Sequence, residues 1–217
     1  MVHNIHTIIQ ILRAASSEWG EPIVTEIASI NRDPFKVLIS TVISLRTKDD
    51  VTREASERLY QLADTPEEML KLSSKKIEKA IYPAGFYKNK AKTILDISKV
   101  IVSKYNSKVP DDLDELLKLK GIGRKTANLV LTQGYGLPGI CVDTHVHRIS
   151  NRIGYVSTKT PKDTEFALRE KLPKEYWIEY NDLLVTFGQN ICKPISPLCS
   201  QCPVHDHCMR VDVTIHR

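Results

Sequence analysis

The chain has 217 residues, of which 41% are hydrophobic and 26% are charged, so it is neither mostly disordered nor collagen-like. Its 31 basic and 26 acidic residues give a net charge of +5, which permits a polyanionic partner and is also common in proteins without one. No apolar run approaches the roughly 20 residues that cross a bilayer, and the first residues lack a signal-peptide cleavage pattern. We therefore expect one or two domains, an intracellular location and no membrane partner.

The hydrophobic pattern has helical spacing along almost the whole chain, and no stretch alternates as a strand would. Capping residues predict helix starts at Asp33, which precedes a proline, at the capping box that begins with Thr65, and at Ser74. Further helices are expected at 87–106, in a short segment after Pro110 that ends near Lys118, and at 124–133, 144–153, 161–171 and 175–189. The remainder is rich in proline and cysteine. The sequence predicts an all-α body with a cysteine-bearing tail.

The segment LKGIGRKTA, residues 119–127, lies between two predicted helices. Gly121 and Gly123 allow a tight turn with close backbone approach. The unpaired N–H groups at the start of the second helix, together with Arg124 and Lys125, form an anion site suited to a nucleic-acid phosphate. The alternative is a plain helical hairpin with glycine at a C-cap, but the full motif favours phosphate binding.

Lys125 and Asp143 are the candidate catalytic pair. A lysine at a helix start is often solvated or bound to phosphate, whereas a reactive lysine needs its ammonium destabilised by burial or by the helix dipole. Asp143 follows 18 residues later in the segment VDTH, and the intervening chain is long enough to return to Lys125. Asp143 is also expected to cap the next helix. His145 and His147 point to different helix faces, so a metal pair is not favoured there.

The tail carries four cysteines spaced C-x6-C-x2-C-x5-C. In a reducing compartment, such a group indicates a metal site rather than a pair of disulfides. Four thiolates make a closed four-coordinate site, for iron–sulfur or for zinc, and in a zinc site His205 or His207 could replace a cysteine. The candidate ligands are Cys192, Cys199, Cys202 and Cys208. Cys141 lies outside the set and is expected to be a buried apolar side chain.

Together, the hairpin LKGIGRKTA, the segment VDTH and the four-cysteine run resemble the endonuclease III family of DNA repair glycosylases, in the family's order and spacing. The resemblance extends from about Pro34 to Cys208. It implies two all-α domains that flank a DNA-binding cleft, and a 4Fe–4S cluster held by the four cysteines. The domains would be a six-helix barrel at 27–137 and a discontinuous cluster domain at 1–26 and 138–217.

The resemblance also implies roles for single residues. Lys125 would attack C1′ of the damaged nucleotide, and Asp143 would stabilise the cationic sugar and assist proton transfer. β-Elimination through the Schiff base would then break the strand 3′ to the lesion. The implied DNA contacts are Gly121, Gly123, Arg124, Arg46, Phe86, His145 and Lys193.

Two of these contacts would fill the vacancy left when the target base leaves the stack. Arg46 stands where some members of the family have glutamine, and Phe86 where they have leucine; we call this pair the wedge residues. Lys193 is the one charged residue of the loop at 193–198, which is often strongly basic in the family. A major DNA contact from this loop is therefore not expected.

The resemblance implies an enzyme whose partner is double-stranded DNA with oxidised pyrimidines or abasic sites, and a monomer is the simplest expectation. One alternative is a monofunctional mismatch glycosylase, but such relatives usually carry tyrosine or serine where this chain has Lys125. Another is a non-catalytic DNA-binding module. Phosphate binding alone requires neither Asp143 nor its spacing from Lys125, so the bifunctional glycosylase and lyase is favoured.

Overall fold

A computed structural model describes residues 4–17, 19 and 22–217 of the chain. Throughout these residues the regular structure is helical and contains no strand, which confirms the all-α fold. Within the same residues, no helix is long and apolar enough to span a lipid bilayer.

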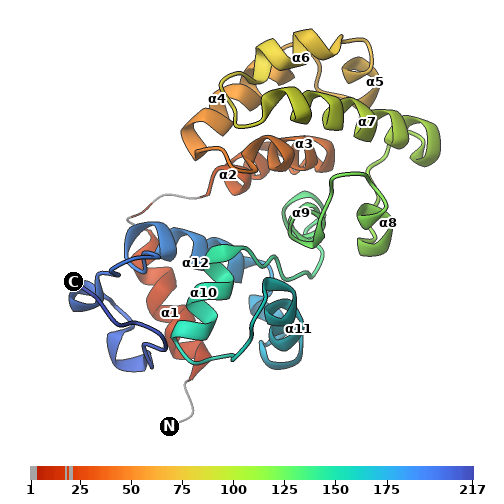
Figure 1. The fold of residues 1–217 in the computed structure, drawn as a ribbon. Coiled ribbons are helices and arrows are strands. Elements are labelled where there is room, and N and C mark those ends of the chain that lie inside the picture. The colour runs from red at the N-terminus through yellow and green to blue at the C-terminus, as the bar shows by residue number, and fades with distance from the viewer. Residues whose placement is uncertain (1–3, 18, 20–21) are drawn as a thin grey trace. The chain divides into compact units, whose positions relative to one another are not determined.

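The chain divides into two compact units (Figure 1). The central unit is Ile23–Leu137, and the terminal unit combines Met1–Pro22 with Pro138–Arg217. Residues 1–3, 18, 20 and 21 of the expected N-terminal segment lie outside the described residues.

The central unit is built from helices and short connections. Its α-helices are α2 (Ile23–Asn31), α3 (Pro34–Ser44), α4 (Asp49–Tyr60), α5 (Pro66–Met69), α6 (Ser74–Ile81), α7 (Tyr87–Tyr105), α8 (Leu113–Leu117) and α9 (Arg124–Leu129). A π-helical stretch, Val130–Gly134, continues α9, so the helix expected at 124–133 changes its hydrogen-bonding pattern after the 6 residues of α9.

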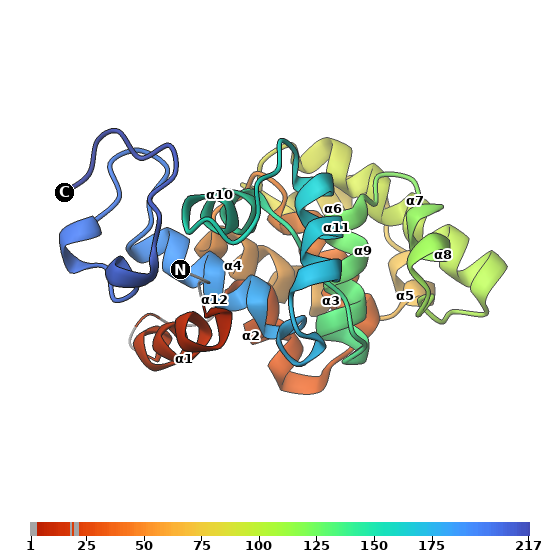
Figure 2. The same cartoon turned by 90° about the horizontal axis from the view of Figure 1, so that it is seen from below.

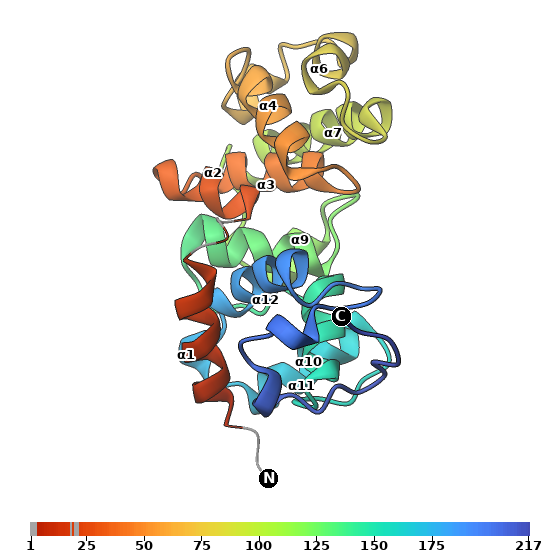
Figure 3. The same cartoon turned by 90° about the vertical axis from the view of Figure 1, so that its left-hand side faces the viewer.

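Helix α3 is the centre of this unit, with α4 and α7 on one side and α9 on the other (Figures 1 and 3). A helix buried on all sides needs apolar residues around its whole circumference. The sequence of α3 meets this need with Phe35, Val37, Leu38, Ile39, Val42 and Ile43, all at most 4% exposed.

The predicted caps explain where several helices begin. Asp33 accepts hydrogen bonds from the N–H groups of Phe35 and Lys36, and Thr65 accepts one from Glu68 N–H at 3.3 Å. The cap expected at Ser74 was wrong by one residue. Ser73 is the N-cap, because its Oγ accepts from the Lys76 N–H at 3.3 Å, and Ser74 is the first helical residue.

The terminal unit brings the N-terminal helix together with the last helices of the chain. Its α-helices are α1 (Ile5–Ser16), α10 (Thr144–Arg152), α11 (Pro161–Lys171) and α12 (Glu179–Asn190). Helix α12 begins later than expected, because a separate 3₁₀ turn occupies Lys174–Tyr176. Helices α1 and α12 lie side by side (Figure 2).

One apolar core runs through the terminal unit and reaches the tail. Ile8, Ile149 and Phe187 contribute from α1, α10 and α12, and Val204 contributes from the tail itself. Beyond α12 the chain forms only 3₁₀ turns, at Cys199–Gln201 and His205–His207. Three of the tail cysteines, Cys192, Cys202 and Cys208, pack against this core.

Candidate functional site

The glycine hairpin joins α8 to α9 in the central unit. Leu119 and Ile122 are buried on either side of Gly121 and anchor the turn. Gly121 has a φ of +87°, a left-handed conformation that strains any residue with a Cβ atom. A Cβ there would also lie 3.1 Å from Thr93 Cγ2 of α7. The turn therefore has one specified shape, and its sequence requires glycine at position 121.

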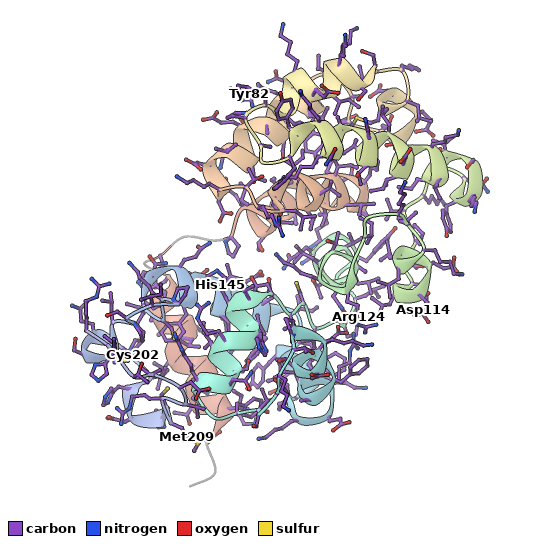
Figure 4. All side chains as sticks on the ribbon, viewed as in Figure 1. Tyr82, Asp114, Arg124, His145, Cys202 and Met209 are labelled. Atoms are coloured by element: carbon purple, nitrogen blue, oxygen red, sulfur yellow. The ribbon has the colours of Figure 1, made fainter. Side chains whose placement is uncertain are left out.

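The start of α9 presents an open helix end. Its N-cap is Gly123, which has extended backbone and makes no side-chain capping bond. A Cβ at Gly123 would meet no protein heavy atom within 4 Å. Arg124, labelled in Figure 4, and Lys125 are the first two residues of α9, and both are half-buried. An uncapped helix start beside two cations is suited to an anion such as a phosphate.

The two predicted catalytic side chains lie in different units. Lys125 is in the first turn of α9, and Asp143 is the N-cap of α10. Oδ1 of Asp143 accepts a 2.8 Å hydrogen bond from the Val146 N–H, which confirms the expected capping role. This bond fixes the carboxylate at the start of α10. That Lys125 and Asp143 act on one substrate stays a prediction.

The wedge residues come from separate loops of the central unit and lie together. Arg46 Cζ is 5.5 Å from the centroid of the Phe86 ring, within cation–π range. Both side chains are exposed, and both residues have left-handed backbone, with φ of +54° and +57°. This conformation is uncommon outside glycine and is often found at functional sites. Both residues line the same pocket as Gly121, so the hairpin and the wedge residues share one face.

His145, labelled in Figure 4, lies in the first turn of α10. Its Nδ1 is 3.1 Å from Nη2 of Arg148, and a guanidinium is always a donor. Nδ1 must therefore accept, which leaves the proton of a neutral ring on Nε2. His147 instead pairs its Nδ1 with Thr164 Oγ1 at 2.7 Å. The two histidines thus have different partners, as their spacing predicts.

Helix α12 passes close to His145 at a glycine. A Cβ on Gly188 would overlap His145 Nδ1 and would lie 2.9 Å from Arg148 Nη2. Glycine at position 188 is therefore what permits this approach of α12 to α10, and with it the position of the His145 ring.

The four tail cysteines line one pocket of the terminal unit; Cys202 is labelled in Figure 4. Burial raises the pKa of the Cys202 thiol to about 12. Burial also raises the pKa of Cys199 and of Cys208, and the neighbouring thiols add to the effect in both. Such thiols stay protonated until a metal takes the place of the proton. The remaining wall is mainly apolar, formed by residues such as Ile153, Phe187, Ile191, Leu198 and Val204.

The donor set fits an iron–sulfur cluster better than a single zinc ion. In the part of the chain that the structure describes, no three His, Cys, Asp or Glu side chains converge closely enough to hold one ion. The thiols instead surround a space, as four thiolates must when each binds a different iron of a cluster. His205 and His207 are not among the residues that line the pocket. Cys141 is 1% exposed and also lies outside it, as expected.

Residues 39–174 match the HhH-GPD superfamily of base excision DNA repair proteins, and residues 192–208 match the iron-sulfur binding domain of endonuclease III. The chain is 51% identical to endonuclease III of Thermotoga maritima over 176 residues. These aligned residues cover 81% of this chain and 83% of that protein. The chain belongs to the endonuclease III family. The resemblance drawn from the three motifs is confirmed.

Two further likenesses extend this finding. Endonuclease III homolog 1, chloroplastic, of Arabidopsis thaliana is 45% identical over 183 residues, which cover 80% of this chain and 48% of that protein. The chain thus spans about half the length of this plant relative. A solved structure of a trapped covalent intermediate of endonuclease III with DNA is 37% identical, with a TM-score of 0.77 over 82% of this chain and 84% of that chain.

As an endonuclease III family member, the chain is a base excision DNA repair enzyme with an iron–sulfur cofactor. The cofactor expected from the four cysteines is therefore confirmed at the level of the family. The individual ligands and the DNA contacts stay predictions. Lys193 is half-buried in the loop after α12, and its carbonyl is held by Arg152.

Sequence reasoning missed the residues that support these sites. Arg148 donates to the Cys192 carbonyl at 2.8 Å, and Arg152 donates to the carbonyls of Lys193 and Pro194, both at 2.7 Å. Arg152 Nη1 also lies 3.6 Å from Cys192 Sγ. Two turns of α10 thus hold the loop that carries the first cysteine. The available signal was two arginines four residues apart on a helix that starts at the VDTH segment.

Proposed function

We propose that this chain excises oxidised pyrimidines from double-stranded DNA and then cleaves the strand on the 3′ side of the abasic site. The observation that carries the proposal is the place of Lys125, in the first turn of the helix that the glycine hairpin opens. An amine beside a phosphate-binding turn is positioned to meet the sugar of a bound nucleotide, and a glycosylase that uses water alone needs no amine there.

In this reaction, unprotonated Nζ of Lys125 attacks C1′, and the damaged base leaves with the electron pair of the glycosidic bond. The Asp143 carboxylate stabilises the positive charge that develops on the sugar and accepts a proton from the attacking amine. The C1′–O4′ bond then breaks, the ring oxygen takes up a proton, and the amine becomes a Schiff base at C1′. The Schiff base acidifies the C2′ proton. Loss of that proton forms a C2′=C3′ double bond while the C3′–O3′ bond breaks and the 3′ phosphate leaves, and water then hydrolyses the Schiff base and frees Lys125.

DNA binding in this proposal uses the face shared by the hairpin and the wedge residues. The uncapped start of α9, with Gly121, Gly123 and Arg124, takes a backbone phosphate. Arg46 and Phe86 enter the duplex where the target base has left the stack. The Nε2–H of His145 and the amine of Lys193 supply smaller contacts to the backbone.

The two compact units are proposed to correspond to the two domains of the family. The central unit would be the barrel that carries the hairpin, and the terminal unit would be the cluster domain, with a stabilising role for the cluster. Its ligands would be Cys192, Cys199, Cys202 and Cys208. A protein with this substrate is expected to act inside the cell, as a monomer.

Borohydride trapping tests the lysine directly, because the reductant converts a Schiff base into a stable covalent adduct. Wild-type protein would be mixed with duplexes that carry an abasic site or a thymine glycol. The two variants would be Lys125→Ala and the control Lys120→Ala, which removes the same charge from an exposed position of the same hairpin. We expect adducts with wild type and the control, and none with Lys125→Ala.

Binding of the same duplexes separates catalysis from affinity. Lys125→Ala should retain DNA affinity within about a factor of ten, because the phosphate contacts of Gly121, Gly123 and Arg124 stay in place. An adduct that survives in Lys125→Ala would assign the nucleophile to another amine. No adduct with wild type that holds its full iron content would overturn the lyase and favour a monofunctional glycosylase.

A further inference from the structure

Lys90 is a buried lysine in the first turn of α7. The residue is only 6% exposed and lies on the buried face of α7, together with Ala91, Ile94 and Ile97. Burial lowers the pKa of Lys90 to about 8. A lysine is rarely retained inside a protein unless its charge has partners.

Three oxygens surround the ammonium of Lys90. Nζ donates to the carbonyls of Ile43 and Leu45, both at 2.6 Å, and to Thr47 Oγ1 at 2.8 Å. An ammonium has three N–H groups, and these acceptors use all of them. Two of the acceptors lie at the C-terminal end of α3, where carbonyls lack helical partners and the helix dipole favours a cation. Lys90 therefore ties α7 to the end of α3 and to the residues that follow it.

Thr47 connects Lys90 to the loop that carries Gly85 and Phe86. Its Oγ1, held by Lys90, also accepts a hydrogen bond from the Gly85 N–H at 3.1 Å. At Gly85 the two loops are in backbone contact, because a Cβ there would lie 2.5 Å from the carbonyl oxygen of Arg46. One hydroxyl and one ammonium thus join residues 43–47 to residue 85.

The residues between these fixed points are the wedge residues. Arg46 lies between Leu45 and Thr47, both bonded by Lys90, and Phe86 directly follows Gly85. The backbone N–H of Lys90 also donates to the Phe86 carbonyl at 3.0 Å. The left-handed conformations of Arg46 and Phe86 are strained, and such strain persists only where the surrounding structure over-determines it. Here the fixed points are the bonds of Lys90 and Thr47.

We propose that Lys90 is a positioning residue that holds the Arg46 and Phe86 loops as one preformed wedge, with Thr47 as the link between them. The inference rests on the proposed function, in which these two side chains enter the duplex. Lys90 is 6% exposed and its ammonium is bound to Ile43, Leu45 and Thr47, so it acts through the loops that it holds. Its contribution is preorganisation: the wedge needs no ordering when DNA binds, and a misplacement of about 1 Å at such a site can lower activity about 100-fold.

The test compares double-stranded with single-stranded DNA. Filling a vacancy matters only in a duplex, so a variant with a loose wedge should lose trapping on a duplex abasic site and keep it on a single-stranded one. We expect Lys90→Met to lower the duplex trapping rate between about 10- and 100-fold and to leave the single-stranded rate within about twofold. The control is Lys92→Met, at an exposed position of the same helix, which should change neither rate.

A second variant covers the case in which Lys90→Met does not fold. Thr47→Val removes the shared hydroxyl with little change in volume and should show the same selective loss, about tenfold. Equal losses on both substrates from either folded variant would assign Lys90 a merely structural role. No loss on duplex DNA would also overturn the inference.

Arg46→Ala/Phe86→Ala separates this inference from the proposed function. If the wedge role is correct, the double variant loses duplex trapping, and adding Lys90→Met lowers it by less than threefold more, because coupled residues are not additive. If the double variant traps duplex and single-stranded DNA as wild type does, the wedge role itself is wrong. If it loses duplex trapping while Lys90→Met and Thr47→Val do not, only the positioning role is wrong.

Discussion

The central unit surrounds a helix that buries apolar side chains around its circumference, whereas the last part of the terminal unit, residues 191–217, forms only short 3₁₀ turns around four thiols. In α3, Phe35 and five aliphatic side chains are buried, and each contributes about 1.5–3 kcal/mol relative to exposure. The tail buries few such groups, among them Val204. Hydrophobic burial stabilises the core of the central unit, whereas we expect the tail of the terminal unit to need its cofactor to hold its shape.

Backbone bonds close the tail but do not replace a core. The N–H of Arg217 donates to the Pro197 carbonyl at 2.9 Å, and the Arg217 carbonyl accepts from the Ser200 N–H at 3.0 Å. A net contribution of about 1 kcal/mol for each such bond is small beside the entropy of ordering the segment. Metal binding supplies the larger share in small sites of this kind.

The largest effect is expected from Cys202→Ser. Serine oxygen is a poor ligand for iron in place of a thiolate, so the purified variant should have lost most of its iron, and protease should cut within residues 191–217 before it cuts 23–137. Iron content and limited proteolysis followed by mass spectrometry measure the two results. Cys141→Ala is the control and should retain iron. Unchanged iron in Cys202→Ser would remove this cysteine from the ligand set.

A smaller effect is expected where α10 and α12 meet in the terminal unit. Gly188→Ala should lower the free energy of unfolding by about 1–3 kcal/mol, because its Cβ overlaps His145 Nδ1 and crowds Arg148. Denaturant unfolding measures the loss. The loss should shrink when His145→Ala is combined with it, since the overlapping ring is then absent. Equal losses in both backgrounds would show that the contact with His145 is not the cause.

Local signals in the sequence predicted much of the fold and the motifs of the site. Asp33, Thr65 and Asp143 each cap a helix, because a cap is decided by a side chain and the next three residues. The four cysteines and the hairpin were also visible, since each is a short pattern of uncommon residues. The Ser74 error was one residue because Ser73 and Ser74 have the same capping chemistry.

Tertiary support could not be predicted in the same way. Lys90 binds two backbone carbonyls that lie 47 and 45 residues earlier in the chain. Because every residue has such a carbonyl, the residue types at those positions do not reveal the contact. Arg148 and Arg152 likewise hold carbonyls of the loop that begins at Cys192. The signal for Lys90 in the sequence was its position as a charged residue on the apolar stripe of α7. The π-helical continuation of α9 left no trace, because the hydrophobic spacing does not distinguish it from an α-helix.

The smallest expected effect is a difference in stability between two variants of the hairpin glycines in the central unit. Gly121→Ala should lower the free energy of unfolding by about 1 kcal/mol or more, since alanine is strained at φ +87° and its Cβ lies 3.1 Å from Thr93 Cγ2. Gly123→Ala should stay within about 0.5 kcal/mol of wild type, because the backbone is extended and the Cβ meets no protein atom within 4 Å.

Measuring DNA affinity distinguishes the roles of the two glycines. A loss of affinity in Gly121→Ala can follow from a distorted turn, whereas a loss in Gly123→Ala, at unchanged stability, requires that DNA occupy the space where the new Cβ stands. We expect such a loss, of about tenfold, in a binding titration with duplex abasic-site DNA, because a methyl group would displace a phosphate from the start of α9. Full affinity in Gly123→Ala would place the phosphate elsewhere on the hairpin and leave Gly121 and Arg124 as its candidates.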